Sequence, residues 1–154
     1  MKNISSKPVL KCQISNSKKL RSIIFLGYLP PVNTLRKLKD VSVEEKSFPA
    51  ELLYCPKSKL AQLGHIVDKK ILFPFTYPYT SSTTKILRDN FKNLYKEVTK
   101  KFKLLKKDLI IDIGSNDGNL LTNFQGKHRV LGITPEKIGK LAIKKGIPTI
   151  IDYY

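Results

Sequence analysis

The sequence predicts an α/β protein in which a small N-terminal domain is followed by a linking helix and an incomplete sheet of alternating strands and helices. Three observations support this prediction. An apolar strand predicted over 108–113 is followed by a glycine-flanked turn and then by a helix, which is the order of elements at the nucleotide sites of α/β folds. An amphipathic pattern covers 85–105. Both cysteines of the chain, Cys12 and Cys55, lie ahead of that pattern.

The N-terminal segment contains two local signals between its cysteines. Paired prolines in 28–33 indicate a turn or an extended loop, and 37–45 is charged and expected to be solvated. A disulfide between the two cysteines is disfavoured, because the sequence indicates a reducing compartment.

The linking helix is predicted over 85–105. Its apolar residues recur at intervals of three and four, which places them on one stripe. They are Leu87, Phe91, Leu94, Tyr95, Val98, Phe102 and Leu105. The opposite face is mostly lysine and is expected to meet solvent, so the apolar stripe should dock on the sheet.

The remaining sheet is predicted to be short. Strands are expected over 108–113, 129–134 and 147–151, with helices over 117–124 and 135–145. A sheet of this class normally uses several more alternating strands and helices. The predicted domains are therefore 1–75, 76–106 and 107–154, and the last is expected to be the truncated N-terminal half of its fold.

The charge of the chain raises the question of an anionic partner. The 29 basic and 12 acidic residues give a formal charge of +17, which suits nucleic acid or a membrane surface. Only four of the basic residues are arginine, however, and the lysines are spread along the chain. A solvated lysine surface is favoured over a nucleic-acid partner. With no run of eighteen apolar residues and no signal peptide, the prediction is a cytoplasmic protein without a membrane partner.

The glycine-flanked turn carries the most specific signal. Gly114 and Gly118 allow a close approach of backbone and ligand, while Asp112 and Asn116 supply polar atoms at the end of the strand. The glycine spacing differs from the dinucleotide fingerprint, and the loop holds no cation for a pyrophosphate. An acidic strand end suits a ligand with a cation and a ribose, such as S-adenosylmethionine (SAM).

The amino-acid sequence of residues 112–121 resembles the first SAM motif of a family of sugar C-methyltransferases that carry an N-terminal zinc-binding domain. Further landmarks of this family occur in the same order, at 12–15, 26–33, 52–55, 77–82 and 146–150. The resemblance covers nearly the whole chain. It implies a degenerate zinc-binding-like domain, a linking helix and an incomplete Rossmann-like SAM-methyltransferase sheet of class I.

The resemblance implies that Cys12 and Cys55 are metal ligands of two Cys-x-x-Cys knuckles. Ser15 and Ser58 stand where each second cysteine is expected, and a serine hydroxyl is a poor zinc ligand. His65 and water could complete a site. In the alternative, the cysteines are small buried residues. Apolar contacts would then hold the segment, through Ile23, Ile24, Phe25, Leu26, Leu52, Leu53, Tyr54 and Leu63.

The resemblance also assigns cofactor residues. The SAM-binding set at the turn is Asp112, Gly114, Ser115, Asn116 and Gly118. The second strand ends at Thr134, where an acidic residue would normally hold the ribose hydroxyls, so this contact is weakened or passes to Glu136. Glu136 equally suits the first turn of a helix after Pro135.

An aromatic and hydroxyl-rich stretch over 73–84 is the predicted substrate surface. Aromatic rings cover the apolar side of a sugar and hydroxyls bind its oxygens, although the same residues also suit a core and a helix cap. The resemblance implies that Tyr77 and Tyr79 face the substrate, with Tyr77 assisting proton transfer, and that Ser81 and Ser82 bind it.

Asn33 is a further candidate for the substrate site. Its side chain suits a hydrogen bond to a sugar hydroxyl or, equally, the cap of a turn.

These observations predict a SAM-dependent C-methyltransferase acting on a nucleotide-linked keto-sugar. The reaction needs a base that removes the proton beside the ketone, and neither His65 nor His128 suits that role. The base is expected in a C-terminal region outside this chain, so the chain alone is predicted to be inactive. The alternatives are a truncated, non-catalytic binding or interaction remnant and, less favoured, a basic RNA-associated protein.

Overall fold

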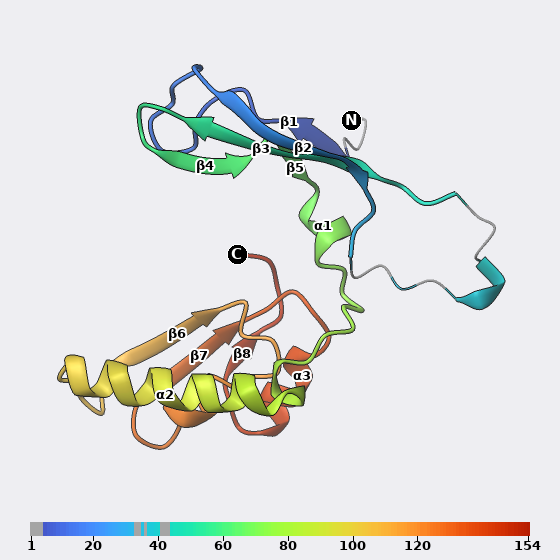
Figure 1. Ribbon diagram of the computed structural model, residues 1–154. Helices are drawn as coiled ribbons and strands as arrows, with labels where there is room; N and C mark the ends of the chain where they lie inside the picture. The colour runs from blue at the N-terminus through green and yellow to red at the C-terminus, as the bar shows by residue number, and fades with distance from the viewer. Residues whose placement is uncertain (1–4, 33–34, 36, 41–43) are drawn as a thin grey trace. The chain divides into compact units, whose positions relative to one another are not determined.

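The structure is a computed structural model that describes residues 5–32, 35, 37–40 and 44–154 (Figure 1). The chain divides into two compact units, Met1–Leu72 and Phe73–Tyr154. Both contain small β-sheets, and the chain as a whole is mixed α/β.

Unit 1 is built from short antiparallel pairings. One sheet pairs β1 (Ser6–Pro8) with β5 (His65–Val67). The other is a meander of β2 (Arg21–Leu29), β3 (Phe48–Cys55) and β4 (Leu60–Leu63). A 3-10 turn, η1 (Leu38–Asp40), and a short helix, α1 (Lys69–Leu72), complete the described part of this unit.

The meander of unit 1 leaves most of its apolar side chains exposed. Phe25 and Leu26 of β2 are 53% and 62% exposed, and Leu63 of β4 is 64% exposed. The interpretation that apolar contacts of this strand hold the segment together is therefore wrong for β2. The physical reason is that the described part of unit 1 has no second layer to cover the three-stranded meander. Only three side chains of its described residues are both apolar and buried, those of Cys12, Phe48 and Cys55.

Unit 2 contains a three-stranded parallel sheet in the order β6-β7-β8. The strands are β6 (Leu109–Ile113), β7 (Arg129–Ile133) and β8 (Thr149–Ile150). The helices are α2 (Lys85–Lys101) and α3 (Gly139–Lys144), with 3-10 turns η2 (Ser81–Thr83) and η3 (Leu121–Asn123). All three predicted strands are present, and the linking helix is α2.

The core of unit 2 lies between the sheet and α2, which runs alongside the strands in Figure 1. Its buried side chains are Leu121, Phe124, Val130, Ala142 and Ile147, against which Tyr95 and Val98 of α2 pack. The ring of Tyr95 meets that of Phe124 edge-on at 4.9 Å. The helix ends at Lys101, four residues earlier than predicted, because Phe102 takes an extended conformation.

Two predicted helices differ from the structure. Turns and η3 replace the helix expected over 117–124, because Asn116 and Gly118 take positive φ angles of 50° and 76° that a right-handed helix cannot accept. The helix expected over 135–145 is reduced to α3. No helix in the described part of the chain is long and apolar enough to cross a membrane.

Candidate functional site

The turn after β6 is tied to the end of the neighbouring strand. The backbone N–H groups of Gly114 and Ser115 both donate to the carbonyl oxygen of Ile133, at 2.8 and 3.1 Å. Gly114 has a φ of +85°, and a Cβ built on it would meet nothing within 4 Å. The backbone at this point is therefore open to an approaching ligand.

Asp112 supplies the acidic group at this end of the sheet. It is the penultimate residue of β6 and its side chain is half-buried. Burial raises the pKa of its carboxyl group, because a charged group loses hydration there. A cation placed beside this carboxylate would compensate for that loss.

Asn116 joins the turn to the aromatic and hydroxyl-rich segment. Its Oδ1 accepts a hydrogen bond from the backbone N–H of Ser81 at 2.9 Å, and its Nδ2 donates to the carbonyl of Tyr79 at 3.1 Å. Ser81 and Asn116 are buried. The fold thus brings together residues that the sequence assigned separately to the cofactor and to the substrate.

Asp117 makes further contacts between the turn after β6 and the segment that holds Ser81. The sequence pattern did not identify this residue. Its side chain is completely buried, accepts a hydrogen bond from Ser81 Oγ at 2.5 Å and pairs with Lys145 Nζ at 3.1 Å. Burial alone would raise the pKa of this carboxyl group. Hydrogen bonds from Ser81, Ser82 and Lys145, with the charge of Lys145, outweigh that effect and lower the pKa. Asp117 therefore stays ionised inside the unit.

Gly118 and Ser115 are both buried in the interior of unit 2. A Cβ on Gly118 would lie 2.8 Å from Ile147 Cδ1 and 2.9 Å from Ala142 Cβ, so only glycine lets the turn pack this closely. The hydroxyl of Ser115 is buried beside Gly132 and has no hydrogen-bond partner in the described residues.

The end of β7 holds a second polar pair. Thr134 is fully buried and donates a hydrogen bond to the carboxylate of Glu136, which is also buried. Helix α3 begins at Gly139, so Glu136 precedes it. The interpretation of Glu136 as a residue of the first helical turn is wrong, because the chain makes a separate turn after Pro135.

The predicted substrate residues lie on the segment before α2. Tyr77 lines an open cleft of about 500 Å³ between residues 75–77 and 137–144, and Lys137, Lys140 and Lys144 also line it. The side chain of Tyr79 is 45% exposed. The carbonyl oxygen of Ser82 accepts a hydrogen bond from Arg88 Nη1. Asn33 lies outside the described residues.

Unit 1 contains two turns of the same form. The backbone N–H of Asn16 donates to the carbonyl of Cys12 at 3.0 Å, and that of Lys59 to the carbonyl of Cys55 at 2.9 Å. Asn16 and Lys59 each take a left-handed φ, of 54° and 60°. A knuckle fold is therefore preserved around both cysteines.

The four side chains of these turns meet, and we call Cys12, Ser15, Cys55 and Ser58 the thiol–hydroxyl cluster. Cys12 Sγ lies 3.0 Å from Ser58 Oγ, and Cys55 Sγ lies 3.4 Å from Ser15 Oγ. Both thiols are free and fully buried. The side chain of Ser15, its backbone N–H and the Ser58 hydroxyl lower the pKa of Cys12 to about 6, which outweighs burial; the pKa of Cys55 is also lowered.

The donor set of this cluster does not fit a tetrahedral zinc site. Zinc is held by thiolates, imidazoles and carboxylates, and here two of the four positions are hydroxyls already bonded to the thiols. No group of three or more His, Cys, Asp or Glu side chains that could hold a metal occurs among the described residues. His65 lies on β5, and its buried Nδ1 has no hydrogen-bond partner among the described residues.

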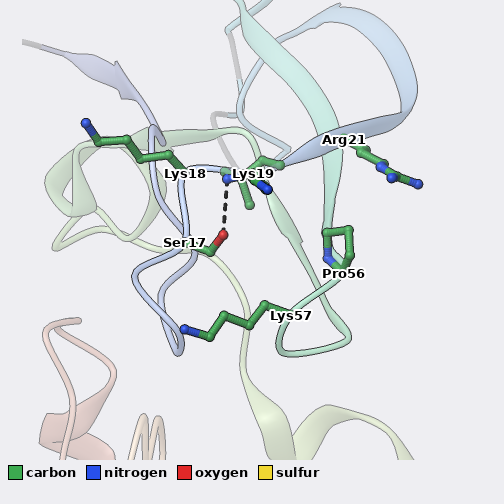
Figure 2. Close-up of a pocket in the computed structure, with 7 residues that line it drawn as sticks. Ser17, Lys18, Lys19, Arg21, Pro56 and Lys57 are labelled. Atoms are coloured by element: carbon green, nitrogen blue, oxygen red, sulfur yellow. Dashed lines mark hydrogen bonds between the residues drawn. The ribbon is translucent and has the colours of Figure 1, made fainter.

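A basic cleft borders the two turns in unit 1. It has a volume of about 920 Å³ and is lined by residues 17–21, 56 and 57. Figure 2 shows that the side chains of Lys18, Arg21 and Lys57 point in different directions around it, and that Ser17 Oγ accepts a hydrogen bond from the Lys19 backbone, at 3.1 Å. This arrangement attracts anions in general but does not converge on one ligand atom.

Two comparisons with known proteins give matches for this chain. Residues 12–73 match a family model described as "Putative zinc binding domain". The chain is also 25% identical over 146 residues to the C-methyltransferase NovU of Streptomyces niveus. The resemblance to C-methyltransferases is confirmed. The match covers 94% of this chain and 34% of NovU, so the chain spans about one third of the length of the relative it matches.

Proposed function

We propose that this chain carries the cofactor-binding part of a SAM-dependent C-methyltransferase that acts on a nucleotide-linked keto-sugar. The observation that carries the proposal is the open backbone at Gly114, beside the half-buried carboxylate of Asp112, at the carboxyl end of β6. Ligands of open parallel sheets bind in this position. The similarity to a protein named a C-methyltransferase supports the same reaction class.

The residues around the turn suit the parts of SAM. Asp112 would face the ammonium group of the methionine end, and the exposed Gly114 would admit the ligand to the backbone. Glu136, which follows the next strand and accepts a hydrogen bond from the fully buried Thr134, would hold the ribose hydroxyls. The parallel order β6-β7-β8 supports the proposal that this sheet is one half of a Rossmann-like sheet. When bound, SAM supplies an electrophilic methyl group.

The segment over 77–82 suits the sugar nucleotide. The ring of Tyr79 is exposed enough to cover a sugar face, and Tyr77 borders a cleft with three lysines that suits a diphosphate. Ser81 donates its hydroxyl to Asp117, so its role is to fix this segment against the cofactor turn. Ser82 lies next to it and would bind the substrate.

Methyl transfer to carbon requires a base that removes the proton beside the ketone and leaves an enolate, which attacks the methyl group. We assign Tyr77 an assisting role in that proton transfer. The base itself is assigned to a region corresponding to the part of NovU beyond the match. The exposed face of β6, formed by Leu109, Ile111 and Ile113, supports a need for such a region, because these side chains are 42–54% exposed. The chain alone would then bind SAM without turnover.

The test is SAM binding measured by calorimetry on three proteins. We expect the wild-type chain to bind SAM, and Gly114→Ala to weaken binding about tenfold or more, because the added methyl group enters the ligand's approach. Gly126→Ala is the matched control. Gly126 also has a positive φ, of +80°, and open space around its Cβ, but it lies in the loop before β7. No SAM binding by the wild type, or equal losses in both variants, would contradict the proposal.

A non-catalytic binding remnant is the second candidate, and the serines at positions 15 and 58 favour it. It predicts SAM binding that never leads to methyl transfer. Joining the chain to the region corresponding to the remainder of NovU separates the two candidates, because only the enzyme candidate predicts activity in that longer protein.

A further inference from the structure

Unit 1 matches a zinc-binding domain yet presents only half of the expected thiols. We propose that the thiol–hydroxyl cluster takes the place of the metal ion, and that hydrogen bonds between the two turns hold unit 1 together without zinc.

The first support is the direction of the contacts. Each thiol is bonded to the hydroxyl of the opposite turn: Cys12 to Ser58, across 46 residues, and Cys55 to Ser15, across 40. The contacts between Sγ and Oγ therefore cross-link the same four positions that a tetrahedral metal would join. The Ser15 N–H also donates to Cys12 Sγ, at 3.4 Å, which fixes that thiol within its own turn.

The second support is burial. Cys12 and Cys55 are both 0% exposed, whereas the large apolar side chains of β2 are about half exposed or more. The main hydrophobic cluster of the described residues belongs entirely to unit 2. Small domains without a large apolar core need another cross-link to stay folded. In unit 1 the two fully buried thiols lie where two distant segments meet, and the Ser15 and Ser58 residues bonded to them are half-buried.

The third support is a pair of hydrogen bonds from the side chain of Gln62 on β4. The buried carboxamide of Gln62 accepts a hydrogen bond from the backbone of Gln13, at 3.0 Å, and donates one to the carbonyl of Lys11, at 3.3 Å. These residues flank Cys12 on both sides. The first turn is therefore anchored to the β3–β4 hairpin, which also bears Cys55 and Ser58 at its connection. Protein groups alone thus hold the two turns in place.

The first experiment measures metal content and its consequence for stability. The full 154-residue chain is produced with zinc in the medium, and bound zinc is measured by mass spectrometry, followed by thermal unfolding with and without a strong chelator. We expect zinc far below one ion per chain and the same unfolding midpoint in both conditions. One zinc ion per chain, with a lower midpoint after chelation, would overturn the proposal.

The second experiment restores the absent thiols. The double variant Ser15→Cys with Ser58→Cys should bind one Zn²⁺ per chain and show the absorption of tetrahedral thiolate coordination with Co²⁺. Its unfolding midpoint should rise by roughly 15 °C or more when Zn²⁺ is about a thousandfold above its dissociation constant. Ser5→Cys with Ser22→Cys is the matched control, because it adds two thiols to exposed positions of unit 1. Equal zinc binding by the wild type and the restored variant would contradict the proposal.

The third experiment removes one hydroxyl. Ser58→Ala should increase amide hydrogen exchange at Asn16 and Lys59 about tenfold, because the hydrogen bond that joins the two turns is lost. Ser17→Ala is the control, since the Ser17 hydroxyl bonds only within its own segment, to Lys19. A zinc-held unit would show no difference between these variants, because neither hydroxyl would be needed.

Discussion

The two units of this chain reach a folded state by different means. Unit 2 buries a cluster of apolar side chains between its parallel sheet and α2, and it also holds the fully buried carboxylate of Asp117, which pairs with the partly exposed Lys145. Unit 1 exposes the apolar side chains of β2 and, where its two turns meet, buries two thiols that are bonded to half-buried serine hydroxyls. The comparison shows that a short antiparallel meander relies on specific cross-links where it cannot rely on buried area.

The largest expected difference between the units comes from truncating one aliphatic side chain in each. Leu121→Ala in the core of unit 2 should cost about 2–5 kcal/mol, because it leaves a cavity around a fully buried site. Ile24→Ala on β2 should cost less than about 1 kcal/mol, since that side chain is 48% exposed. Urea denaturation of each variant measures both values. Similar losses would show that the units share one mode of stabilisation.

The next test compares a partly buried ion pair of unit 2, in which only the carboxylate is buried, with an exposed one. Asp117→Asn should cost about 2–3 kcal/mol, because it removes a charge that accepts hydrogen bonds from Ser81 and Lys145 in the interior. Asp89→Asn should cost less than about 0.5 kcal/mol, because its pair with Lys85 is exposed. Chemical denaturation distinguishes the two, and a loss of similar size would deny Asp117 a structural role.

The same carboxylate predicts a dependence on pH. The pKa of Asp117 is lowered in the folded state, so its contribution to stability is fully present above its pKa in the unfolded chain, about 3.9. That contribution is lost as the pH falls through the lower folded pKa. The wild type should therefore lose more stability than Asp117→Asn on acidification below pH 4.

A smaller effect is expected from Gln62→Ala in unit 1. The variant removes two hydrogen bonds that position the backbone around Cys12, at a cost of about 1–2 kcal/mol. Amide exchange over residues 11–17 should rise while unit 2 is unchanged. Gln125→Ala is the control in unit 2, where an exposed carboxamide bonds to the carbonyl of Lys145. If Gln62→Ala leaves amide exchange over residues 11–17 unchanged, the hydrogen bonds of Gln62 do not position the turn that contains Cys12.

The most local test follows the Cys12 thiol. Its pKa is lowered from the ordinary value of 9.0 to about 6, first by the Ser15 side chain and then by the Ser15 N–H and Ser58. The contribution of the Cys12 thiolate to folding stability is therefore fully present above pH 9 and is lost as the pH falls through about 6. Thiolate absorbance of wild type and Cys12→Ser, recorded across this range, measures the step. A single midpoint near 9 would contradict the hydrogen-bonded arrangement.

Local patterns explain how much of the fold was predictable. Leu109–Ile113 and Arg129–Ile133 are short apolar runs, and α2 has a clear helical stripe, so these elements were found from periodicity. The prediction of a helix at 117–124 was wrong because Asn116 and Gly118 take left-handed conformations, where Gly118 lies close to Ile147 and Ala142 and Asn116 is bonded to Ser81 and Tyr79. The sequence pattern also missed the exposure of β2, because an apolar strand reads the same whether or not a layer covers it.

The amino-acid sequence by itself determined the three strands of unit 2, the linking helix, the flexible glycine at position 114 and the two Cys-x-x-Ser turns, because each depends on neighbours within a few residues. Only the tertiary structure decided that Ser81 is bonded to Asp117, that Lys145 neutralises that carboxylate, and that each thiol meets the serine of the other turn. These partners lie 28–46 residues apart. Which distant polar groups meet is decided by chain topology and burial, and no local pattern records it.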